Sequence, residues 1–583
     1  MASKRRKSRK AEGAAPDKQK SADRRFAIAI FGSAIALWAS FPPVGLSLLA
    51  WIAPAGWIYV AKTEAKITRR GWWALWASGA LFWLATLQGI RLAYWPLHFG
   101  WLALSLFLAI YTPLFVVIAR RLTGQFAGGK LPMYLAAPVS WVACELARAW
   151  ILTGFAACGL AHSQVAFPVV IQIADQLGTY GVSFVMILTC AAVVELCLAA
   201  RAGKLRQAFV PAAAASVCIT GMLAYGVWKL SEADQMLLAQ SDDPPLLDAL
   251  LVQENTPTVF DSGRSGKDLQ EAYFRYLDTT RQAVRKHGIP DLVVWPESTF
   301  GGGLPYVLPD RPSPIPALPA RSSEERQADL QILDSNFKAG VFYTLRAARG
   351  EEMQGPIVES PKTPHLLVGT TVVRITPDED QKYNSALFIN PRGEVAGQYD
   401  KMHAVMFGEY FPLGVLLKPL RDMYPITIFT GSEPQAFEVG ETRVAPNICF
   451  ESMVPRLISR QVRELAARGA SPDVIANLSN DSWFRGSSML DHHLACTILT
   501  AVENRRPVIV AANTGISAQI DGSGRVLQRS KRKTATAILA QPRADSRPGL
   551  VQAVGYPLAW LCGLVSFIAC LPFGSRFSQA DAM

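Results

Sequence analysis

The sequence predicts a multi-pass α-helical membrane domain of about eight spans joined to a layered α/β domain. Half of the 583 residues are hydrophobic, and the apolar runs cluster between Phe26 and Leu230, with one more near the C-terminus. The middle of the chain has globular composition, and its strand-like and helical patterns alternate. We therefore divide the chain into a basic cytoplasmic tail (1–25), seven transmembrane helices (26–230), a soluble domain (245–547) and an eighth transmembrane helix (551–573).

The spans are predicted from length and apolarity. A helix needs about 20 mostly apolar residues to cross a hydrocarbon core of about 30 Å. The fifth run contains Glu145 and Arg148, three residues apart on one helical face, so we expect them to pair inside the bundle. The eight candidate runs are Phe26–Phe41, Leu46–Ala61, Trp72–Ile90, Trp101–Ala119, Leu131–Leu152, Tyr180–Ala200, Ala208–Trp228 and Val551–Pro572.

Charge alternates between successive connections. The N-terminal tail and every second loop (62–70, 120–130 and 201–206) are basic, whereas the links between them carry little positive charge, with Arg91 and Lys229 as exceptions. Cytoplasmic flanks of membrane helices are enriched in Lys and Arg. The N-terminus is therefore predicted to be cytoplasmic and the soluble domain to lie on the other side of the membrane. Because this rule accounts for much of the net charge of +12, no nucleic-acid partner is expected.

One connection is too long for a tight turn. The link from Thr153 to Thr179 contains the run Gly154 to Gln164, with several small and apolar residues. Two readings remain open. It is either a surface loop or an element under the soluble domain, near a lipid entry.

The soluble domain has a mixed order of elements. Periodicity and turn residues predict strands and helices that alternate, with a hairpin about Pro391-Arg392-Gly393 and a Pro- and Gly-rich loop over 301–320. The segment 318–364 looks enlarged and has no assigned role. Predicted strands cover 247–252, 292–295, 366–375, 385–390, 395–399, 442–448, 474–478, 508–512 and 517–520, and predicted helices cover 267–286, 322–348, 453–467 and 490–504.

Three polar residues each follow a strand-like run. Glu297 ends Trp295-Pro296-Glu297, Lys401 follows the run 395–399, and Cys449 lies on a strand-to-helix turn. In layered α/β folds such strand ends gather catalytic groups. The helix dipole is expected to lower the pKa of the Cys449 thiol. A Cys, a Glu and a Lys together supply a thiol nucleophile, its base and a cationic stabiliser.

The sequence motifs around these residues resemble those of a known family. The soluble domain resembles the carbon–nitrogen hydrolase (nitrilase) family, and the whole chain, with its spans, resembles the bacterial apolipoprotein N-acyltransferase family. The resemblance covers nearly the full length and implies a nitrilase-like αββα sandwich for the catalytic domain, 245–547. It is carried by Trp295-Pro296-Glu297-Ser298, Tyr383-Asn384-Ser385-Ala386, Tyr399 to His403, Phe407 to Pro412, Ile448 to Glu451, Asn480 to Phe484, Asn513 to Ser517 and Tyr180 to Phe184.

The resemblance also implies an activity. A triad of Glu297, Lys401 and Cys449 would move a fatty acyl chain from a phospholipid, through a thioester, to the α-amine of the S-diacylglyceryl-cysteine of an apolipoprotein. Implied partners are the phospholipid donor, the diacylated lipoprotein acceptor and the membrane, and the implied location is the bacterial inner membrane with the catalytic domain periplasmic. No cofactor or metal is expected, and a metal reading of Asp491-His492-His493 is disfavoured because adjacent His residues do not share a helix face. Supporting or substrate-binding positions are Glu409, Phe450, Glu451, Asn480 and Trp483.

The sequence departs from the family at some points. Phe450 stands where the family often has Tyr, Met406 replaces a usual Pro, and the stretch 253–260 lacks a Trp that the family commonly has there. Apolar loops are expected to gate the site toward the bilayer, with ordinary core packing as the alternative. These loops are Val405-Met406-Phe407, Phe411 to Leu417 and Gly301 to Leu308.

Two other functions remain open from the sequence. A membrane-tethered amidase or nitrilase would use water to hydrolyse a C–N bond, and a non-catalytic lipoprotein-binding or scaffold protein would keep the fold without the chemistry. The eight apolar runs favour lipid substrates. The intact Glu297, Lys401 and Cys449 argue against the scaffold.

Overall fold

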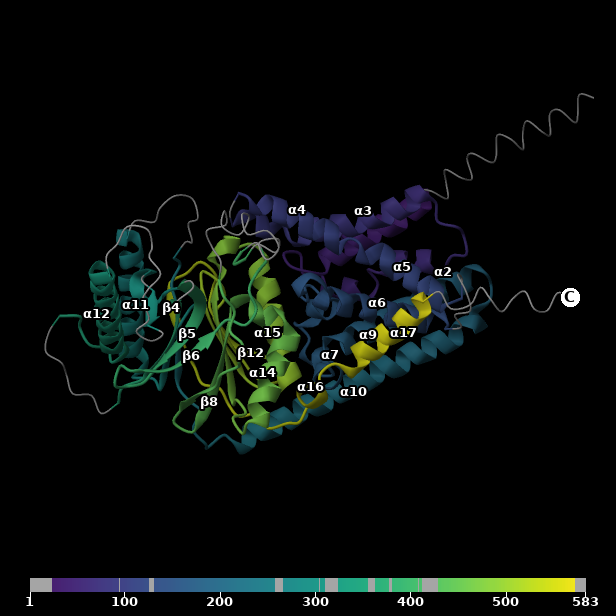
Figure 1. Cartoon of the computed structure of the whole chain (residues 1–583). Coiled ribbons are helices and arrows are strands. Elements are labelled where there is room, and N and C mark those ends of the chain that lie inside the picture. The colour runs from purple at the N-terminus through teal and green to yellow at the C-terminus, as the bar shows by residue number, and fades with distance from the viewer. Residues whose placement is uncertain are drawn as a thin grey trace, which may run out of the picture.

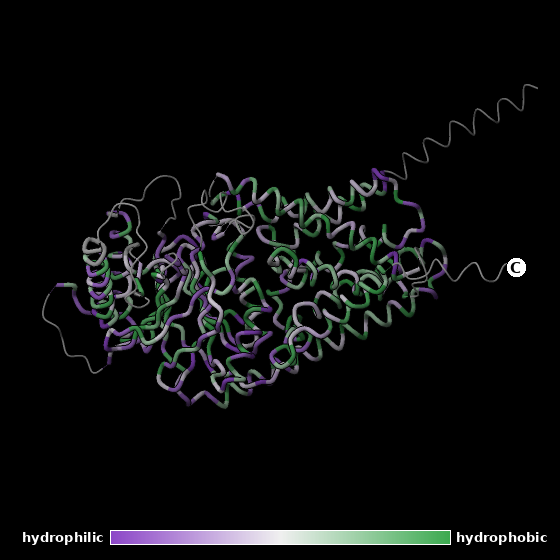
Figure 2. Tube along the Cα trace, viewed as in Figure 1, coloured by the Kyte–Doolittle hydropathy of each residue, from purple (hydrophilic) through white to green (hydrophobic). Residues whose placement is uncertain are grey.

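The computed structural model has two parts, a helical bundle and a sheet-containing domain (Figure 1). In Figure 2 the hydrophobic residues dominate the helices of the bundle, whereas hydrophilic residues are frequent around the sheets. The expected N-terminal tail lies mostly outside the described residues. The structure describes residues 24–93, 95–124, 131–256, 266–303, 305–309, 323–354, 362–376, 380–406, 408–410 and 428–571.

The bundle contains helices at or near all the predicted spans. Within the described part of the chain, three helical segments are long and apolar enough to cross a membrane by length and composition: Leu97–Leu122, Thr179–Arg201 and Leu205–Ala239. The last apolar helix, Pro557–Cys570, is shorter, so a total of eight spans remains a prediction. The described helices are 24–39, α2 (Ala55–Lys62), α3 (Arg69–Thr86), α4 (Leu97–Leu108), α5 (Tyr111–Leu122), α6 (Met133–Trp150), α7 (Pro168–Ile171), α8 (Ala174–Leu177), α9 (Thr179–Arg201), α10 (Phe209–Ala239), α16 (Leu550–Val554) and α17 (Pro557–Cys570), with 3-10 turns η1 (Ser47–Trp51), η2 (Gln88–Leu92), η3 (Ile151–Thr153), η4 (Leu160–Gln164) and η5 (Leu205–Ala208).

The other domain contains two mixed sheets. In the first, β1 (Ala249–Gln253), β2 (Leu292–Trp295) and β4 (His365–Ile375) run parallel, and β3 (Tyr306–Pro309) pairs with β4. The order is β13-β1-β2-β4-β5-β6. The second sheet has the order β12-β11-β10-β9-β8-β7, with β8, β9 and β10 parallel. The remaining strands are β5 (Asp380–Ile389), β6 (Val395–Asp400), β7 (Phe437–Val439), β8 (Thr442–Ile448), β9 (Val474–Asn480), β10 (Val508–Asn513), β11 (Ala518–Ile520), β12 (Val526–Arg529) and β13 (Thr536–Ala540).

Alternating side chains place these sheets in four layers. On β1, Leu250 and Val252 pack toward α11 (Gly266–His287) and α12 (Ser323–Ala348), whereas Ala249 and Leu251 face the second sheet. The other face of the second sheet packs on α14 (Pro455–Ala467) and α15 (Met489–Asn504). Helices therefore cover both outer faces of a two-sheet sandwich, which is the αββα arrangement that the resemblance implied.

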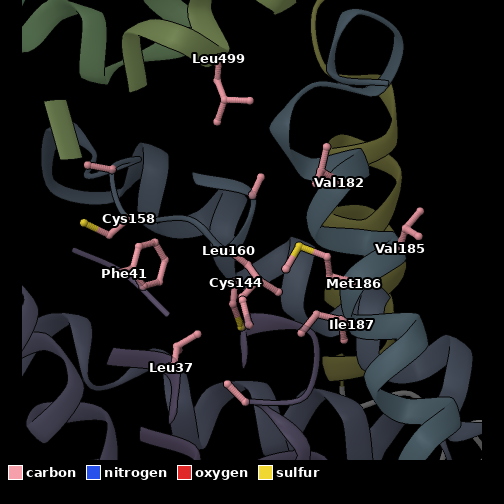
Figure 3. Packing of buried hydrophobic residues seen from close by; sticks show 14 of the residues in the cluster. Leu37, Phe41, Cys144, Cys158, Leu160, Val182, Val185, Met186, Ile187 and Leu499 are labelled. Carbon is pink, nitrogen blue, oxygen red and sulfur yellow. The ribbon is translucent and has the colours of Figure 1, made fainter. Parts of the chain in front are cut away.

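The bundle and the sandwich share one hydrophobic core. The cluster that contains Leu37, Met186 and Val182 of the bundle also contains Cys496 and Leu499 of α15. Figure 3 shows Leu499 extending from α15 toward the bundle side chains. Apolar burial stabilises by about 25 cal/mol per Å², so this continuous contact holds the two parts together as one body.

Some expectations need correction. Glu145 and Arg148 do not pair with each other: Glu145 accepts from the Trp141 indole and the Leu160 N–H, and Arg148 donates to the Phe155 and Ala157 carbonyls. Both side chains therefore fasten the link that follows α6. That link is not a surface loop, because its 3-10 turn η4 is buried. Its lipid-entry role remains a prediction.

One expectation in the sandwich also differs. The predicted loop over 301–320 contains strand β3, which pairs with β4 although it is only four residues long. The helix predicted over 322–348 is present as α12 and continues through Gly340.

Candidate active site

Glu297 lies just after β2, at an end of the first sheet. Here β2 and β4 run so close that a Cβ on Gly369 would meet the Glu297 Cα at 2.5 Å, so only glycine fits. The carboxylate is buried and accepts hydrogen bonds from Asn384 Nδ2 at 2.7 Å and from the Asn480 N–H at 2.9 Å. These donors, one from each sheet, fix the carboxylate in the gap between the sheets.

Lys401 follows β6 and is buried beside two carboxylates. Its Nζ lies 2.8 Å from Glu409 Oε1 and 3.4 Å from Glu297 Oε1. Burial alone lowers the pKa of a lysine, but the charges of Glu409 and Glu297 outweigh it and hold the Lys401 pKa above its ordinary value. The side chain is therefore an ammonium at neutral pH.

Glu409 is held as the permanent partner of that ammonium. Its Oε1 also accepts from Asn384 Nδ2 at 3.0 Å, and its Oε2 accepts from the Val405 N–H at 2.8 Å. Burial raises the pKa of this carboxyl, yet the charge of Lys401 and these hydrogen bonds outweigh burial and leave the pKa below its ordinary value. The position expected to support the site therefore contacts Lys401 directly.

Cys449 begins the turn after β8. It is the first residue of the 3-10 turn η8 (Cys449–Met453), has a φ of +52°, and interacts electrostatically with both Glu297 and Lys401. The expectation of a lowered pKa is wrong: burial and the charge of Glu297 outweigh Lys401 and hold the thiol pKa well above 9.0. At neutral pH the thiol is protonated, so a reaction at sulfur requires a base.

Glu451 joins the turn after β8 to the turn after β6. Its Oε1 accepts from the Met402 and His403 N–H groups at 2.7 and 3.0 Å, and its Oε2 accepts from the Ile448 N–H at 2.7 Å and the Tyr399 hydroxyl at 2.8 Å. The side chain is fully buried, and burial raises its pKa to about 7. It therefore fixes Lys401 and Cys449 relative to each other without contacting either functional group.

The other three predicted supporting residues are Asn480, Phe450 and Trp483. Asn480 ends β9, and its backbone N–H, not its side chain, contacts Glu297. Phe450 stacks on His403, with ring centroids 5.9 Å apart, and lies 6.5 Å from Phe155 of the link after α6. Trp483 is partly buried in the turn η9 (Asp481–Phe484).

Sequence reasoning assigned no role to two contributors. Asn384 donates hydrogen bonds to both Glu297 and Glu409. It belongs to the motif Tyr383-Asn384-Ser385-Ala386, which carries the family resemblance, but no role was predicted for it. His493, considered above only as a metal ligand, pairs with Asp481 and reaches the Cys449 carbonyl. Both roles depend on which strands and helices pack together, which the sequence pattern does not reveal.

The gating loops are described only in part. Val405 and Met406 lie next to Glu409, and Gly301 to Gly303 belong to a 3-10 turn after Glu297. Phe407, Leu304 and the run Phe411 to Leu417 lie outside the described residues. The same holds for 257–260, the last part of the stretch 253–260 where the sequence departs from the family pattern.

Comparisons with known proteins place these features in families. Residues 33–192 match the model of the apolipoprotein N-acyltransferase N-terminal domain, and residues 263–547 match that of carbon-nitrogen hydrolase. An apolipoprotein N-acyltransferase from Rhodopirellula baltica is 31% identical over 91% of this chain and 94% of its own. One from Geobacter metallireducens is 28% identical over 91% and 92%. A solved Saccharomyces cerevisiae member of branch 10 of the nitrilase superfamily aligns with 53% of this chain and 96% of its own, with 16% identity and a TM-score of 0.33.

Proposed function

The chain belongs to the apolipoprotein N-acyltransferase family, and from that premise we propose that it moves a fatty acyl chain from a phospholipid to a lipoprotein through Cys449. The acceptor in this proposal is the α-amine of an S-diacylglyceryl-cysteine. Glu297, Lys401 and Cys449 are the proposed catalytic residues, with Glu409 and Glu451 as their supports.

The first half-reaction acylates the thiol. Glu297 takes the proton from the Cys449 sulfur as the sulfur attacks the ester carbonyl of the phospholipid, and a C–S bond forms. The ammonium of Lys401 and the N–H groups that open η8 stabilise the oxyanion. As the C–O bond breaks, Glu297 gives this proton to the leaving oxygen, so lysophospholipid departs as an alcohol and Glu297 is a carboxylate again.

The second half-reaction transfers the acyl chain to the amine. The α-amine of the acceptor attacks the thioester and loses a proton to Glu297, a C–N bond forms, and the C–S bond breaks. The departing sulfur regains a proton from Glu297, which restores the resting site. Because the donor product leaves before the acceptor reacts, ping-pong kinetics are expected.

One observation carries the proposal. Glu297 and Lys401 are 3.4 Å apart, and both interact electrostatically with Cys449, which has a protonated thiol. Glu409 forms an ion pair with Lys401 at 2.8 Å and accepts a hydrogen bond from the Val405 N–H, so its carboxylate already has partners. Glu297 is left as the carboxylate suited to proton transfer.

The proposal includes a membrane arrangement. We place the N-terminal tail in the cytoplasm, seven spans over 26–230, the catalytic domain (245–547) on the periplasmic side and an eighth span over 551–573. The alternating charge of the loops supports this orientation. Three helices among the described residues are long and apolar enough to cross a bilayer, which supports membrane insertion but not its direction.

Mass spectrometry of the purified protein incubated with phospholipid tests the chemistry. A fatty-acyl mass on Cys449, absent from Cys449→Ala, is the expected result. Adding an S-diacylglyceryl peptide should remove this mass and yield N-acylated peptide. Release of free fatty acid without N-acylated peptide would instead indicate the membrane-tethered hydrolase, and no adduct at all would contradict acyl transfer.

A further inference from the structure

A buried charged pair lies behind the nucleophile turn and takes no part in the mechanism above. His493 of α15 approaches Asp481 of η9, with Nδ1 3.0 Å from Asp481 Oδ1. Both side chains are almost entirely buried. Asp481 also accepts from the Ser479 hydroxyl at 2.8 Å, so its carboxylate is fixed at the end of β9. This fixes the orientation of the imidazole ring.

The second nitrogen of His493 points at the turn that carries the nucleophile. Nε2 lies 3.1 Å from the Cys449 carbonyl oxygen and 2.7 Å from Ser452 Oγ. A carboxylate and a carbonyl only accept hydrogen bonds, so both ring nitrogens donate and the ring is an imidazolium. The charge of Asp481 outweighs burial and raises the His493 pKa, in agreement with this assignment.

The Cys449 carbonyl is held by more than one donor. Asn477 Nδ2 donates to it at 3.2 Å and Ser452 Oγ at 3.2 Å, in addition to His493. Among these donors, His493 is the only cation, and hydrogen bonds from charged donors are about twice as strong as neutral ones. Cys449 needs such support because a non-glycine residue at a φ of +52° costs about 1–3 kcal/mol.

Fixing this carbonyl also fixes the next N–H. In a planar trans peptide the C=O and N–H point in opposite directions, so the Phe450 N–H is turned away from His493. As a residue of the first turn of η8, Phe450 has an N–H without an acceptor inside the helix. That N–H is therefore free to bind a charge that forms at the Cys449 sulfur.

We propose that His493, oriented by Asp481, is a positioning residue that holds the Cys449–Phe450 peptide so that the Phe450 N–H binds the oxyanion of the acyl-transfer intermediates. The inference rests on the proposed function, because it assumes attack of Cys449 on a carbonyl. His493 acts through the backbone and does not touch the reacting atoms.

Two reactions of the same thiol test the proposal. Acylation by a p-nitrophenyl ester forms an oxyanion, whereas alkylation by iodoacetamide does not. His493→Leu, which cannot donate, should slow ester acylation of Cys449 by about 10- to 1,000-fold, up to the effect of losing an oxyanion donor outright. Alkylation should change by less than about threefold. His493→Gln, which has an amide donor, should recover part of the acylation rate, and Asp481→Asn should fall between wild type and His493→Leu.

The neighbouring His492 supplies the matched control. It is equally buried on α15 but packs on Phe41, with ring centroids 5.9 Å apart, away from the turn. His492→Gln should leave the ratio of acylation to alkylation at the wild-type value. Parallel loss of both reactions in His493→Leu, or an unchanged ratio, would overturn the proposal. So would a wild type whose thiol is alkylated but never acylated by the ester, whereas acylation by the ester but not by phospholipid would reject only the proposed function.

Discussion

At the scale of single residues, the charge balance around Lys401 decides what each carboxylate does. One ammonium faces two carboxylates, at 2.8 Å from Glu409 and 3.4 Å from Glu297. The site is therefore net negative before the thiol ionises. Burial raises the pKa of Cys449 most, and the charge of Glu297 raises it further, so that Lys401 cannot lower it below its ordinary value. A thiol with a raised pKa, beside a carboxylate, is suited to losing its proton during attack and not beforehand.

Removing the charge of Glu297 should separate proton transfer from thiol acidity. In Glu297→Gln the base is lost, so acylation of Cys449 by phospholipid should fall by about 10²- to 10⁴-fold. The same change removes the negative neighbour that raises the thiol pKa, so alkylation by iodoacetamide should reach half of its maximal rate at a lower pH than in wild type. Alkylation rates measured across pH, beside acylation followed by mass spectrometry, check both outcomes.

A control for this prediction is Glu438→Gln. Glu438 is an exposed carboxylate that pairs with Arg443 at 3.3 Å on the same domain, far less buried than Glu297. Its loss should leave both reactions unchanged. If alkylation and acylation of Glu297→Gln declined together at every pH, Glu297 would be holding the thiol in place and not accepting its proton.

Glu451 should make stability depend on pH. Burial raises its folded-state pKa from 4.5 to about 7. A group with a raised pKa stabilises the folded state fully below its unfolded pKa and loses that contribution as the pH rises through the folded pKa. Glu451→Gln cannot titrate, so its deficit in stability relative to wild type should shrink by about 3 kcal/mol from about pH 5 to about pH 8.

Thermal unfolding in detergent at several pH values measures this deficit. Glu464→Gln on α14 is the control, since Glu464 is a partly exposed partner of Arg460. Its difference from wild type should stay constant over the same range. A deficit for Glu451→Gln that widened with pH would mean that its folded pKa is depressed, with the four hydrogen-bond donors outweighing burial.

The residues that the sequence predicted share one local signal. Glu297, Lys401 and Cys449 each follow a strand. The strand pattern and the family motifs both identify the ends of these strands in the sequence. The second set of contributors has no such signal: Asn384 reaches two carboxylates only through the pairing of β5 with β4 and β6, and His493 depends on how α15 packs. The pKa of the Cys449 thiol is raised, whereas the helix dipole predicted a lowered pKa. Burial and the charge of Glu297 cause the difference, and neither is visible in the local sequence around Cys449.

At the scale of elements, a buried ion pair joins the bundle to the sandwich. Arg505, at the end of α15, donates to Asp175 of α8 at 2.7 Å, and neither side chain is exposed. Arg505 also donates to Gln172 Oε1 at 2.8 Å, and Tyr225 of α10 donates to Asp175. Two bundle helices and the C-terminal end of α15 therefore meet at one carboxylate.

Removing this cation should destabilise the junction. Arg505→Met leaves Asp175 charged and buried, which costs about 3–5 kcal/mol. Arg525→Met is the matched control, because Arg525 also joins the sandwich to the bundle, through Asp234 of α10, but with side chains 28% and 55% exposed. That pair contributes about 0–1 kcal/mol. Thermal unfolding in detergent should therefore show a clear loss for Arg505→Met alone, and equal losses would contradict the proposed importance of burial.

The elements themselves were predicted unevenly. The strand patterns give β2 and β8 their observed bounds, because β-branched and apolar residues fill β2 and make up most of β8. The sequence pattern predicts no strand at β7, β12 or β13, and it predicts a loop where β3 lies. These strands are three to five residues long, and they exist through pairing with neighbours, which a local pattern cannot encode.

At the scale of the whole molecule, the site lies where the sandwich meets the bundle. The ring centroid of Phe450, next to Cys449, lies 6.5 Å from that of Phe155, whose carbonyl accepts a hydrogen bond from Arg148 of α6. Alternating strands and helices predicted a layered α/β domain, and the family resemblance predicted the αββα order of its layers. The number of spans was not confirmed, because helices such as α2 and α17 are shorter than a bilayer crossing requires.

The long helix α10 links this architecture to orientation. It has 31 residues, about 46 Å at 1.5 Å per residue, and so exceeds the hydrocarbon core of about 30 Å. In Figure 1 its C-terminal end extends from the bundle to the sandwich. There Lys229 pairs with Glu232 at 2.8 Å, and Arg547 donates to the Lys229 carbonyl. Lys229, an exception to the charge rule, is thus held by protein contacts.

Two exposed lysines, one in the sandwich and one in a connection of the bundle, test the orientation of the protein in the membrane. Lys338→Cys, on α12 with its side chain 74% exposed, should react with a membrane-impermeant maleimide in intact spheroplasts. Lys204→Cys, in the exposed basic connection between α9 and α10, should react only after the membrane is permeabilised, because positive flanks remain cytoplasmic. The unsubstituted chain measures labelling of its native cysteines. Labelling of Lys204→Cys before permeabilisation, with Lys338→Cys protected, would invert the topology and place the acyl-transfer site on the cytoplasmic side.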